Sequence, residues 1–313
     1  MITPAPGTTK DGAPDAIQPH LSVCICTFKR PVLLRRLLEE LEKQETGGAF
    51  SYSIVVADND ATRSAEALVA EFAARSPGRV TYCCEPTQNI ALVRNRAIAH
   101  ARGDFLVFID DDEFPVPAWL AELWKTCESH RVSGVLGPVR PHFDSPPPAW
   151  LIRGRFCERP EFPTGTPLAW SQCRTGNVLF RRAILPADAP PFREQFGTGG
   201  EDVDFFQRMS AAGAKFIWCN EAVAYETVPP SRWTRSYMLR RALLRGKNSL
   251  KIGRGRLLLM VKSLVAVPLY GIVLPFSLLA GHHRFMHLLI RCCDHVGRLL
   301  AAVGLHPMEA RPM

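Results

Sequence analysis

The sequence lacks several patterns that would place it in a common class. Its ten cysteines include no C-x-x-C pair, which argues against a zinc or disulfide framework and fits a reduced, cytosolic compartment. Residues 1–19 contain no apolar run, so they are predicted to be a disordered tail and not a signal peptide. No G-x-G-x-x-G follows the first predicted strand and G-x-x-x-x-G-K-[ST] occurs nowhere, which disfavours dinucleotide-dependent dehydrogenases and P-loop hydrolases.

Acidic residues are nearly absent from the last part of the chain. Residues 228–313 contain fourteen Lys/Arg and two Asp/Glu, a net charge of +12, so the total of +8 leaves −4 for residues 1–227. A basic segment of this kind binds either nucleic acid or an anionic membrane surface. The basic run adjoins an apolar stretch and is expected to lack interleaved exposed aromatic residues, so we expect membrane lipids as partners and no nucleic acid.

A long run without charge occupies residues 263–281. Its 19 residues would extend about 28 Å as a helix, close to the thickness of a bilayer core. The Arg- and Lys-rich stretch before it is typical of the cytoplasmic side of a membrane. We therefore predict that residues 231–313 form a basic and apolar helical region on the cytoplasmic face of the inner membrane. Whether 263–281 spans the membrane or only associates with it stays open, and a buried helical hairpin is the alternative.

Residues 20–230 alternate between strand-like and helix-like segments. Four predicted strands (21–27, 52–58, 79–85 and 104–110) are separated by three predicted helices (32–44, 61–75 and 89–101). This order implies right-handed crossovers and an α/β fold with a mostly parallel, doubly wound sheet, whose binding sites lie beyond the carboxyl ends of the strands. Residues 138–167 are Pro-rich and predicted to be irregular, 201–213 to form a helix, and 215–228 to form a last strand.

Four consecutive carboxylates, Asp110 to Glu113, directly follow the strand-like run "DFLVFI". Strand alternation sends Asp110 and Asp112 to one side and Asp111 to the other. Carboxylates at that spacing can hold a hard divalent cation with open positions for phosphate oxygens. A solvated loop or a helix N-cap is the alternative, and the spacing of an EF-hand calcium loop is absent.

Two further acidic motifs stand at ends of predicted elements. Asp58 and Asp60 in "DND" follow the second strand, where a carboxylate can accept a hydrogen bond from a base or a ribose, although such a motif is more often a turn. In "GTGGEDVDFF", glycines precede Glu201 and Asp202 at a helix start, where the helix dipole favours ionised carboxylates. The alternative for that motif is a simple N-cap box.

Five motifs in register resemble those of the family 2 glycosyltransferases. They are "SVCICTFKRPVLLRRLLEEL", "IVVADND", "RNRAIAHARGDFLVFIDDDEFPVPAWL", "CRTGNVLFRR" and "GGEDVDFFQRMSAAGAKFIWC". The chain is most similar to bacterial glucosyltransferases of succinoglycan and exopolysaccharide synthesis. The resemblance implies an inverting enzyme with a Rossmann-like GT-A catalytic domain. It implies transfer of a hexose from a nucleoside diphosphate sugar, with a UDP-sugar favoured, to a saccharide or lipid-linked acceptor.

The resemblance also implies roles for individual residues. Asp202 matches the catalytic base, and Asp110 and Asp112 match the ligands of Mg²⁺ or Mn²⁺. The residues that match positions contacting the nucleotide sugar are Thr27, Phe28, Arg30, Asp58, Asp60, Asp110, Asp111, Gly176 and Asn177.

The chain departs from the family pattern in two places. The Q-x-x-R-W motif of related synthases is absent, so Trp233, Arg240 and Arg241 are only loose matches to it. Glu226 stands where many relatives have a His, and its role stays open, as does that of Glu201 beside the base. The donor sugar, the acceptor and the linkage are expected to be chosen by residues 138–175, and oligomeric state has no sequence signal. A catalytically inactive nucleotide-sugar-binding module is the alternative function.

Overall fold

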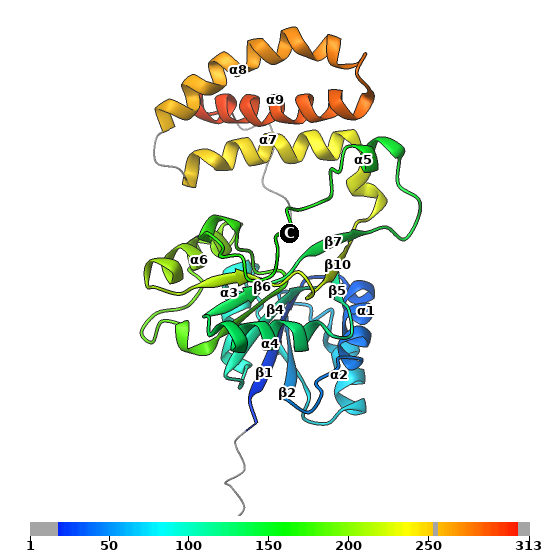
Figure 1. Ribbon diagram of the computed structural model, residues 1–313, viewed down its shortest axis with the longest axis vertical. Helices are drawn as coiled ribbons and strands as arrows, with labels where there is room; N and C mark the ends of the chain where they lie inside the picture. Colours follow the sequence, from blue (N-terminus) through cyan, green and yellow to red (C-terminus); the bar gives the residue numbers. More distant parts are fainter. Residues whose placement is uncertain (1–17, 253–255, 306–313) are drawn as a thin grey trace, which may run out of the picture.

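The computed structural model describes residues 18–252 and 256–305, so most of the predicted tail, 1–19, lies outside the described residues. A seven-stranded sheet forms the centre of the molecule (Figure 1), with the strand order β3-β2-β1-β4-β8-β6-β9. Strands β1, β2, β3 and β4 are parallel to one another, and β8 is antiparallel to both neighbours. The mostly parallel sheet predicted from the sequence is therefore confirmed. Its strands are β1 His20–Thr27, β2 Ser51–Asp58, β3 Val80–Cys84, β4 Phe105–Asp110, β6 Gly134–Leu136, β8 Val178–Arg181 and β9 Phe216–Trp218.

Helices cover both faces of this sheet. One buried apolar cluster joins β1, β2 and β4 to α1, α2 and α4, and a second joins the opposite sides of these strands to α3 and α6. Successive residues of β1, such as Val23 and Cys24, belong to different clusters, because successive side chains of a strand point to opposite faces. The bounds are α1 Pro31–Glu42, α2 Glu66–Arg75, α3 Ile90–His100, α4 Trp119–His130 and α6 Glu201–Ala211. The three predicted early helices and α6 are confirmed, whereas α4 was not predicted.

A second, three-stranded sheet overturns two predictions. Strand β10 (Ala224–Thr227) pairs with β5 (Glu113–Pro115) and β7 (Val139–His142). Residues 215–228 are thus two strands in two sheets and not one strand, because the chain turns at 219–223. The Pro-rich stretch 138–167 contains β7 and α5 (Ala149–Arg153), so it is only partly irregular. Four 3-10 turns lie between these elements and the C-terminal helices: η1 Trp170–Gln172, η2 Arg182–Ile184, η3 Glu194–Phe196 and η4 Pro230–Trp233.

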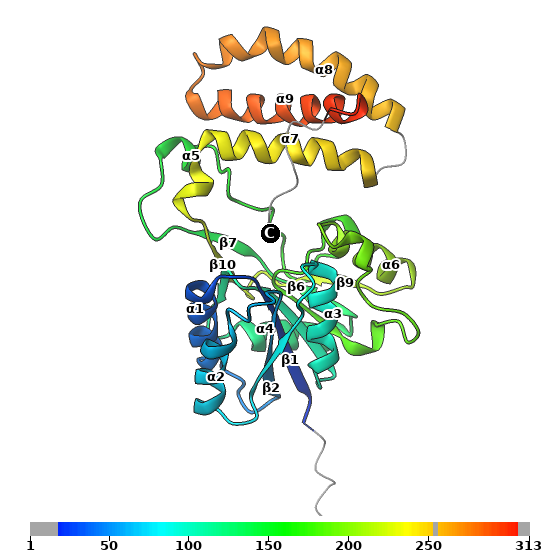
Figure 2. The same ribbon diagram turned by 180° about the vertical axis from the view of Figure 1, so that it is seen from behind.

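Three long helices form a layer at one end of the molecule. They are α7 (Arg235–Ile252), α8 (Arg256–Ser277) and α9 (His282–Ala302), and in both views α9 lies between the other two (Figures 1 and 2). A Cβ on Gly297 of α9 would lie 2.2 Å from the Leu243 carbonyl oxygen of α7, so glycine is required for this close approach. Within the described residues, α8 is the one helix long and apolar enough to cross a membrane.

Candidate active site

A cleft of about 570 Å³ lies at the carboxyl ends of β1 and β4. Its polar lining comes from the loops after β1 and β2, helix α3, the turn after β4, strand β10, the 3-10 turn η4 and the start of α7. Sites at this edge are expected for a parallel sheet, because strand ends and the loops after them meet there. The predicted residues that line it are Thr27, Phe28, Arg30, Asp110, Asp111, Asp112, Glu226 and Arg241.

The acidic cluster folds differently from the predicted alternation. Strand β4 ends at Asp110, residues 111 and 112 form a turn, and β5 begins at Glu113. Asp111 accepts a hydrogen bond from Thr27 Oγ1 at 2.9 Å and one from Arg30 Nη1 at 2.8 Å. Asp112 also accepts from Arg30, at 3.2 Å, so Asp111 and Asp112 share one cation and do not point to opposite sides. The prediction that Asp111 points away from Asp110 and Asp112 was therefore wrong, because a turn breaks the period of two and all three aspartates line the cleft.

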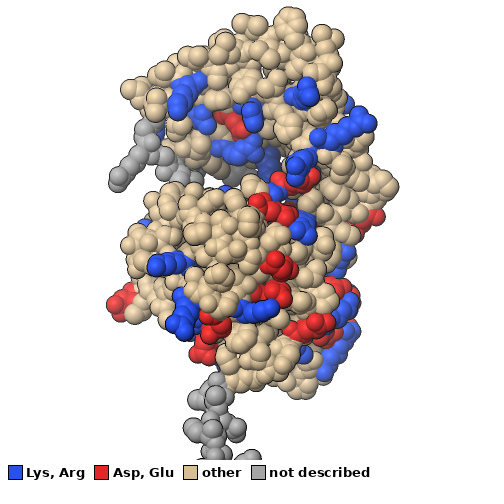
Figure 3. All heavy atoms as spheres, viewed as in Figure 1, with Lys and Arg blue, Asp and Glu red and all other residues tan. Residues whose placement is uncertain are grey.

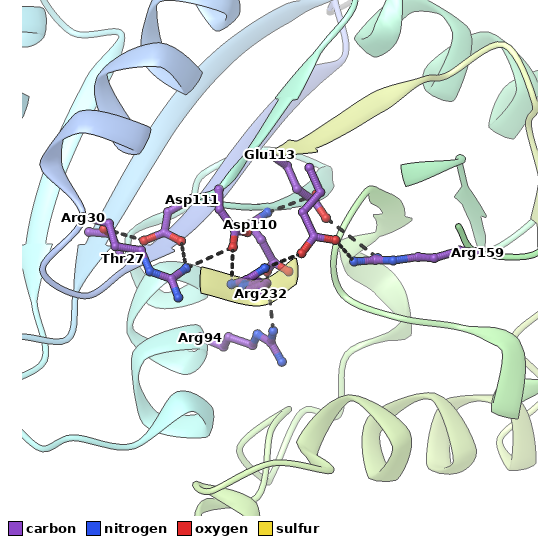
Figure 4. Close-up of polar contacts among 10 residues, drawn as sticks. Thr27, Arg30, Arg94, Asp110, Asp111, Glu113, Arg159 and Arg232 are labelled. Carbon is purple, nitrogen blue, oxygen red and sulfur yellow. Dashed lines mark hydrogen bonds and ion pairs between the residues drawn. The ribbon is translucent and has the colours of Figure 1, made fainter. Parts of the chain in front are cut away.

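Arginines and carboxylates alternate across the cleft (Figure 4). Arg232 donates to Asp112 at 3.0 Å and to Glu226 Oε1 at 2.7 Å. The other oxygen of Glu226 accepts from Arg159 at 2.5 Å. Glu226, which the sequence left without a role, is thus clamped between two guanidinium groups in this structure.

Glu113 and Asp110 supply the least compensated negative charge of the cluster. Among the described residues, Glu113 Oε1 is buried without a hydrogen-bond partner, and the nearest cation atom is Arg159 Nη1 at 3.9 Å. Burial raises the pKa of Glu113 well above its usual value, and the charge of Asp110 raises it further. Burial also raises the pKa of Asp111 to about 6, although Arg30 opposes this shift.

These oxygen donors fit a hard divalent cation. The Asp110 side chain is 48% exposed toward the cleft, and a Cβ on Gly176 would lie 2.9 Å from Glu113 and 3.1 Å from Asp110 carboxylate oxygens. No group of three His, Cys, Asp or Glu with metal-binding geometry occurs in the described part of the chain. Mg²⁺ is commonly held by one or two carboxylates together with substrate phosphates, so this smaller donor set is compatible with it.

The "DND" motif forms a turn. Asp58 is fully buried, and its carboxylate accepts from the backbone N–H groups of Asp60 at 3.1 Å and Ala65 at 2.8 Å. Asp60 accepts from the Thr62 hydroxyl at 2.6 Å. Burial raises the pKa of Asp58, whereas the Thr62 hydrogen bond lowers that of Asp60. Asn59, and neither aspartate, lines the cleft, so a contact of Asp58 or Asp60 with a base stays a prediction.

Glycines position the start of α6. Gly199 and Gly200 have φ values of 121° and 94°, which other residues adopt only with strain. Glu201 is buried and forms an ion pair with the buried Arg94 of α3, which anchors the helix start. Burial raises the pKa of Glu201, and Arg94 opposes this rise. Asp202 is partly exposed, and its Oδ1 accepts only the neighbouring Val203 N–H, at 2.8 Å, among the hydrogen bonds found.

The other predicted residues have structural surroundings. Asn177 is fully buried; its Oδ1 accepts from Trp119 Nε1 at 2.7 Å, and its amide nitrogen donates to Pro138 and Ala222 carbonyls at 2.8 Å each. The Asn177 side chain is therefore held by partners within the protein, and its contact with a sugar stays a prediction. Trp233 donates to the Val228 carbonyl, and Arg240 is exposed away from the cleft lining.

Four residues of the cluster were not among the predicted site residues, although Glu113 belongs to the acidic run noted in the sequence. Arg94, Glu113, Arg159 and Arg232 come from α3, β5, the Pro-rich stretch and η4. Arg232 stands directly before the candidate Trp233, which was an available signal, whereas the contact of Arg159 depends on the path of an irregular loop. That loop also lines a second cavity of about 330 Å³ next to Gly176, with Arg159, Phe162, Gln172 and Arg174 among its residues.

Comparisons with known proteins concern the family and the fold of the chain. The family model "Glycosyl transferase family 2" matches residues 22–186. The succinoglycan biosynthesis protein ExoM of Rhizobium meliloti (strain 1021) is 32% identical over 309 residues, covering 93% of this chain and 95% of that protein. Chondroitin synthase of Escherichia coli is 25% identical over 245 residues, covering 68% of this chain but 35% of the synthase. The structure of S. aureus TarS 1-349 in complex with UDP-GlcNAc has a TM-score of 0.53 at 16% identity, covering 91% of this chain and 92% of that one, and supports the fold alone.

Proposed function

The chain belongs to glycosyltransferase family 2, and from that premise we propose that it transfers a hexose, with inversion, from a nucleoside diphosphate sugar to a lipid-linked saccharide. The observation that carries this proposal is the cleft at the ends of β1 and β4, where three consecutive aspartates meet Arg30 and Arg232. Carboxylates and guanidinium groups in one cleft suit a ligand that brings both phosphates and a divalent cation.

The names of similar proteins support a saccharide product. ExoM is named for succinoglycan biosynthesis, and the E. coli relative is a chondroitin synthase. The TarS structure contains UDP-GlcNAc, which supports a UDP-sugar as donor. We infer a place in the assembly of a cell-surface polysaccharide, with the adjacent cavity near Gly176 as the space for sugar and acceptor.

Inversion requires one in-line displacement at the anomeric carbon. The base takes the proton of the acceptor hydroxyl on the face opposite the departing diphosphate, and Asp202 is the candidate because its carboxylate is partly exposed and lacks a counter-charge within hydrogen-bond reach. When bound, Mg²⁺ or Mn²⁺ offsets the charge of the leaving diphosphate, and Asp110 and Asp112 would hold it. Arg30, Arg232 and Arg241 line the same cleft and would bind phosphate oxygens.

Membrane association is part of the same proposal. The cleft includes Tyr237 and Arg241 of α7, so its opening adjoins the basic and apolar helical layer. A lipid-linked acceptor held at the cytoplasmic face of the inner membrane would reach the cleft from this side. The proposed domain division is a catalytic unit of residues 20–230 and a membrane-associated unit of residues 231–313.

Substitution of Asp202, the proposed base, tests whether the protein is an enzyme or a binding module. Asp202→Asn keeps the side-chain shape and is expected to reduce single-turnover transfer by about 10²- to 10⁴-fold, because general-base assistance is typically of that size. Donor affinity, titrated with Mg²⁺ or Mn²⁺ present, should stay near the wild-type value. Asp204→Asn is the matched control, since Asp204 is two residues along α6 and paired with Arg208 at 2.8 Å. Transfer by Asp202→Asn within about threefold of wild type would place the base elsewhere.

The alternative is an inactive nucleotide-sugar-binding module. Wild-type protein that binds donor but neither transfers nor hydrolyses it, across a panel of nucleotide sugars and lipid-linked acceptors analysed by mass spectrometry, would favour that alternative.

A further inference from the structure

The outer side of α8 is an apolar surface. Within its most apolar 18-residue window only 6% of the residues are buried, which differs from the core helix of a soluble protein. The exposed large side chains recur at helical spacing, so they form a continuous stripe. They are Leu257, Leu258, Val261, Leu264, Val265, Leu269, Ile272, Val273 and Phe276, and the turn after the helix adds Leu278 and Leu279.

The inner side of α8 packs on a helix that carries charges. Arg298 of α9 donates from Nη1 to Ser263 Oγ of α8 at 3.0 Å and from Nε to Ser249 Oγ of α7 at 3.0 Å. The ring of Tyr270 in α8 lies 5.9 Å from that of His295 in α9. These contacts fix the axial alignment of α8 and α9, that is, which residues of the two helices lie side by side.

This alignment of α9 beside α8 is incompatible with an α8 that spans the membrane. Ser263 and Tyr270 are in the central part of α8, so a crossing helix would bring them close to the bilayer midplane. Arg298, and the neighbouring Asp294 that pairs with Arg245 at 2.7 Å, would be carried to the same depth. Charged side chains at the bilayer centre cost several kcal/mol each, and this packing gives them no route to the headgroups.

We propose that α8 lies flat in the surface of an anionic bilayer leaflet, with its apolar stripe in the outer hydrocarbon and both of its ends on the same side. This inference rests on the proposed membrane association and deepens it. Helices of this kind bury an apolar face just below the headgroups and are held by basic residues. In the figures the three helices run across the long axis of the molecule at one end, as a flat attachment requires (Figures 1 and 2).

The charge of the layer matches an anionic leaflet. Across α7, α8 and α9, Asp294 is the one acidic residue within the described part of the chain. Basic side chains gather over α7 and α9, whereas the α8 end is mostly uncharged (Figure 3). The basic residues with described side chains are Arg235, Arg240, Arg241, Arg245, Lys247, Arg256, Lys262, Arg284, Arg291 and Arg298.

Protease accessibility in the full-length chain tests the orientation. A protease site with flexible flanks is inserted between Ala280 and Gly281, and a reference site between Asp188 and Ala189 in an exposed loop of the catalytic unit. We expect both sites to be cut in inside-out membrane vesicles and neither in sealed right-side-out vesicles. The flat orientation would be overturned if the site after Ala280 were cut only in right-side-out vesicles, or in neither vesicle preparation. Either result would leave membrane association intact.

Vesicle flotation of the purified chain tests the surface itself. The probes are phosphatidylcholine vesicles with and without phosphatidylglycerol. Leu264→Glu together with Ile272→Glu should weaken binding at least about tenfold, because each change removes several inserted methylene groups. Val32→Glu is the control, since Val32 is 80% exposed on α1, outside the helical layer. Equal binding by the α8 variant, or a dimer in solution that buries α8 and ignores vesicles, would refute the proposal.

Discussion

Single carboxylates in the cleft differ in their contacts with arginines, and Asp112, like Glu226, contacts two of them. It accepts from Arg30 at 3.2 Å and from Arg232 at 3.0 Å, and its side chain is 10% exposed. Asp112→Ala removes a metal ligand that the family resemblance implies. We expect the gain in donor affinity on adding Mg²⁺ or Mn²⁺ to fall by about tenfold or more, since even outer-shell changes cost 10- to 100-fold.

Calorimetric titration of donor with and without the divalent ion measures that effect. Asp144→Ala is the control, because Asp144 pairs with Arg36 at 3.1 Å, is 65% exposed and does not line the cleft. Asp112 would not be a metal ligand if donor affinity depended on the divalent ion to the same extent in both variants. Full sugar transfer in excess chelator would have the same meaning.

Arg94 is predicted to be a stabilising residue because its charge compensates the buried Glu201. Their side chains are 8% and 6% exposed, so Arg94→Met leaves a buried carboxylate uncompensated, which typically costs about 3–5 kcal/mol. The native pKa of Glu201 then rises further. The folded state would then bind more protons than the unfolded state. The loss in free energy of unfolding therefore grows as pH rises and shrinks as pH falls.

Denaturant unfolding at pH 6 and pH 8 measures this dependence. Adding Glu201→Gln should recover most of the stability, and Arg96→Met, a half-exposed arginine on the same helix, should cost under about 1 kcal/mol. A pH-independent loss in Arg94→Met would show that lost packing, for example against Phe192, dominates instead.

At the scale of elements, close helix packing in the α7–α9 layer depends on glycine. Gly246 and Gly297 leave room where a Cβ would lie 2.1 Å from Asp294 O and 2.2 Å from Leu243 O. Gly297→Val is expected to separate α7 from α9 at a cost of about 1–3 kcal/mol, the usual range for overpacking. Hydrogen exchange of α7 and α9 amides reports the separation. Gly271→Val on α8 is the control, because a Cβ at Gly271 has no neighbour within 4 Å. Equal changes in hydrogen exchange in both variants would contradict the role of Gly297 in packing α7 on α9.

The elements that were predictable are those whose pattern is local. Strands β1 to β4 and helices α1 to α3 follow from β-branched runs and helical spacing, and the carboxyl-end rule gave Thr27, Arg30 and the aspartates as neighbours. The turn at Asp111 and Asp112, the split of 215–228 into β9 and β10, and the contacts of Arg159 depend on pairing between distant segments. A single sequence contains no local signal for such pairing.

For the whole molecule, the uneven distribution of charge predicts how salt affects membrane binding. Residues 1–227 have a net charge of −4, whereas residues 228–313 have a net charge of +12. Raising salt from about 0.1 M to 1 M shortens the Debye length from about 10 Å to about 3 Å, so the attraction between the α7–α9 cations and anionic lipid is largely screened. The apolar stripe of α8 does not depend on charge, and salt does not weaken its insertion.

We therefore expect binding to anionic vesicles to fall, in high salt, to the level seen with neutral vesicles and no further. Flotation across a salt series, with neutral vesicles as the matched control, measures both contributions. Washing native membranes with 1 M salt should leave the chain in the pellet, and detergent should release it. Complete release by salt alone would mean that charge holds the chain at the surface without insertion of α8, and the apolar stripe would then need another partner.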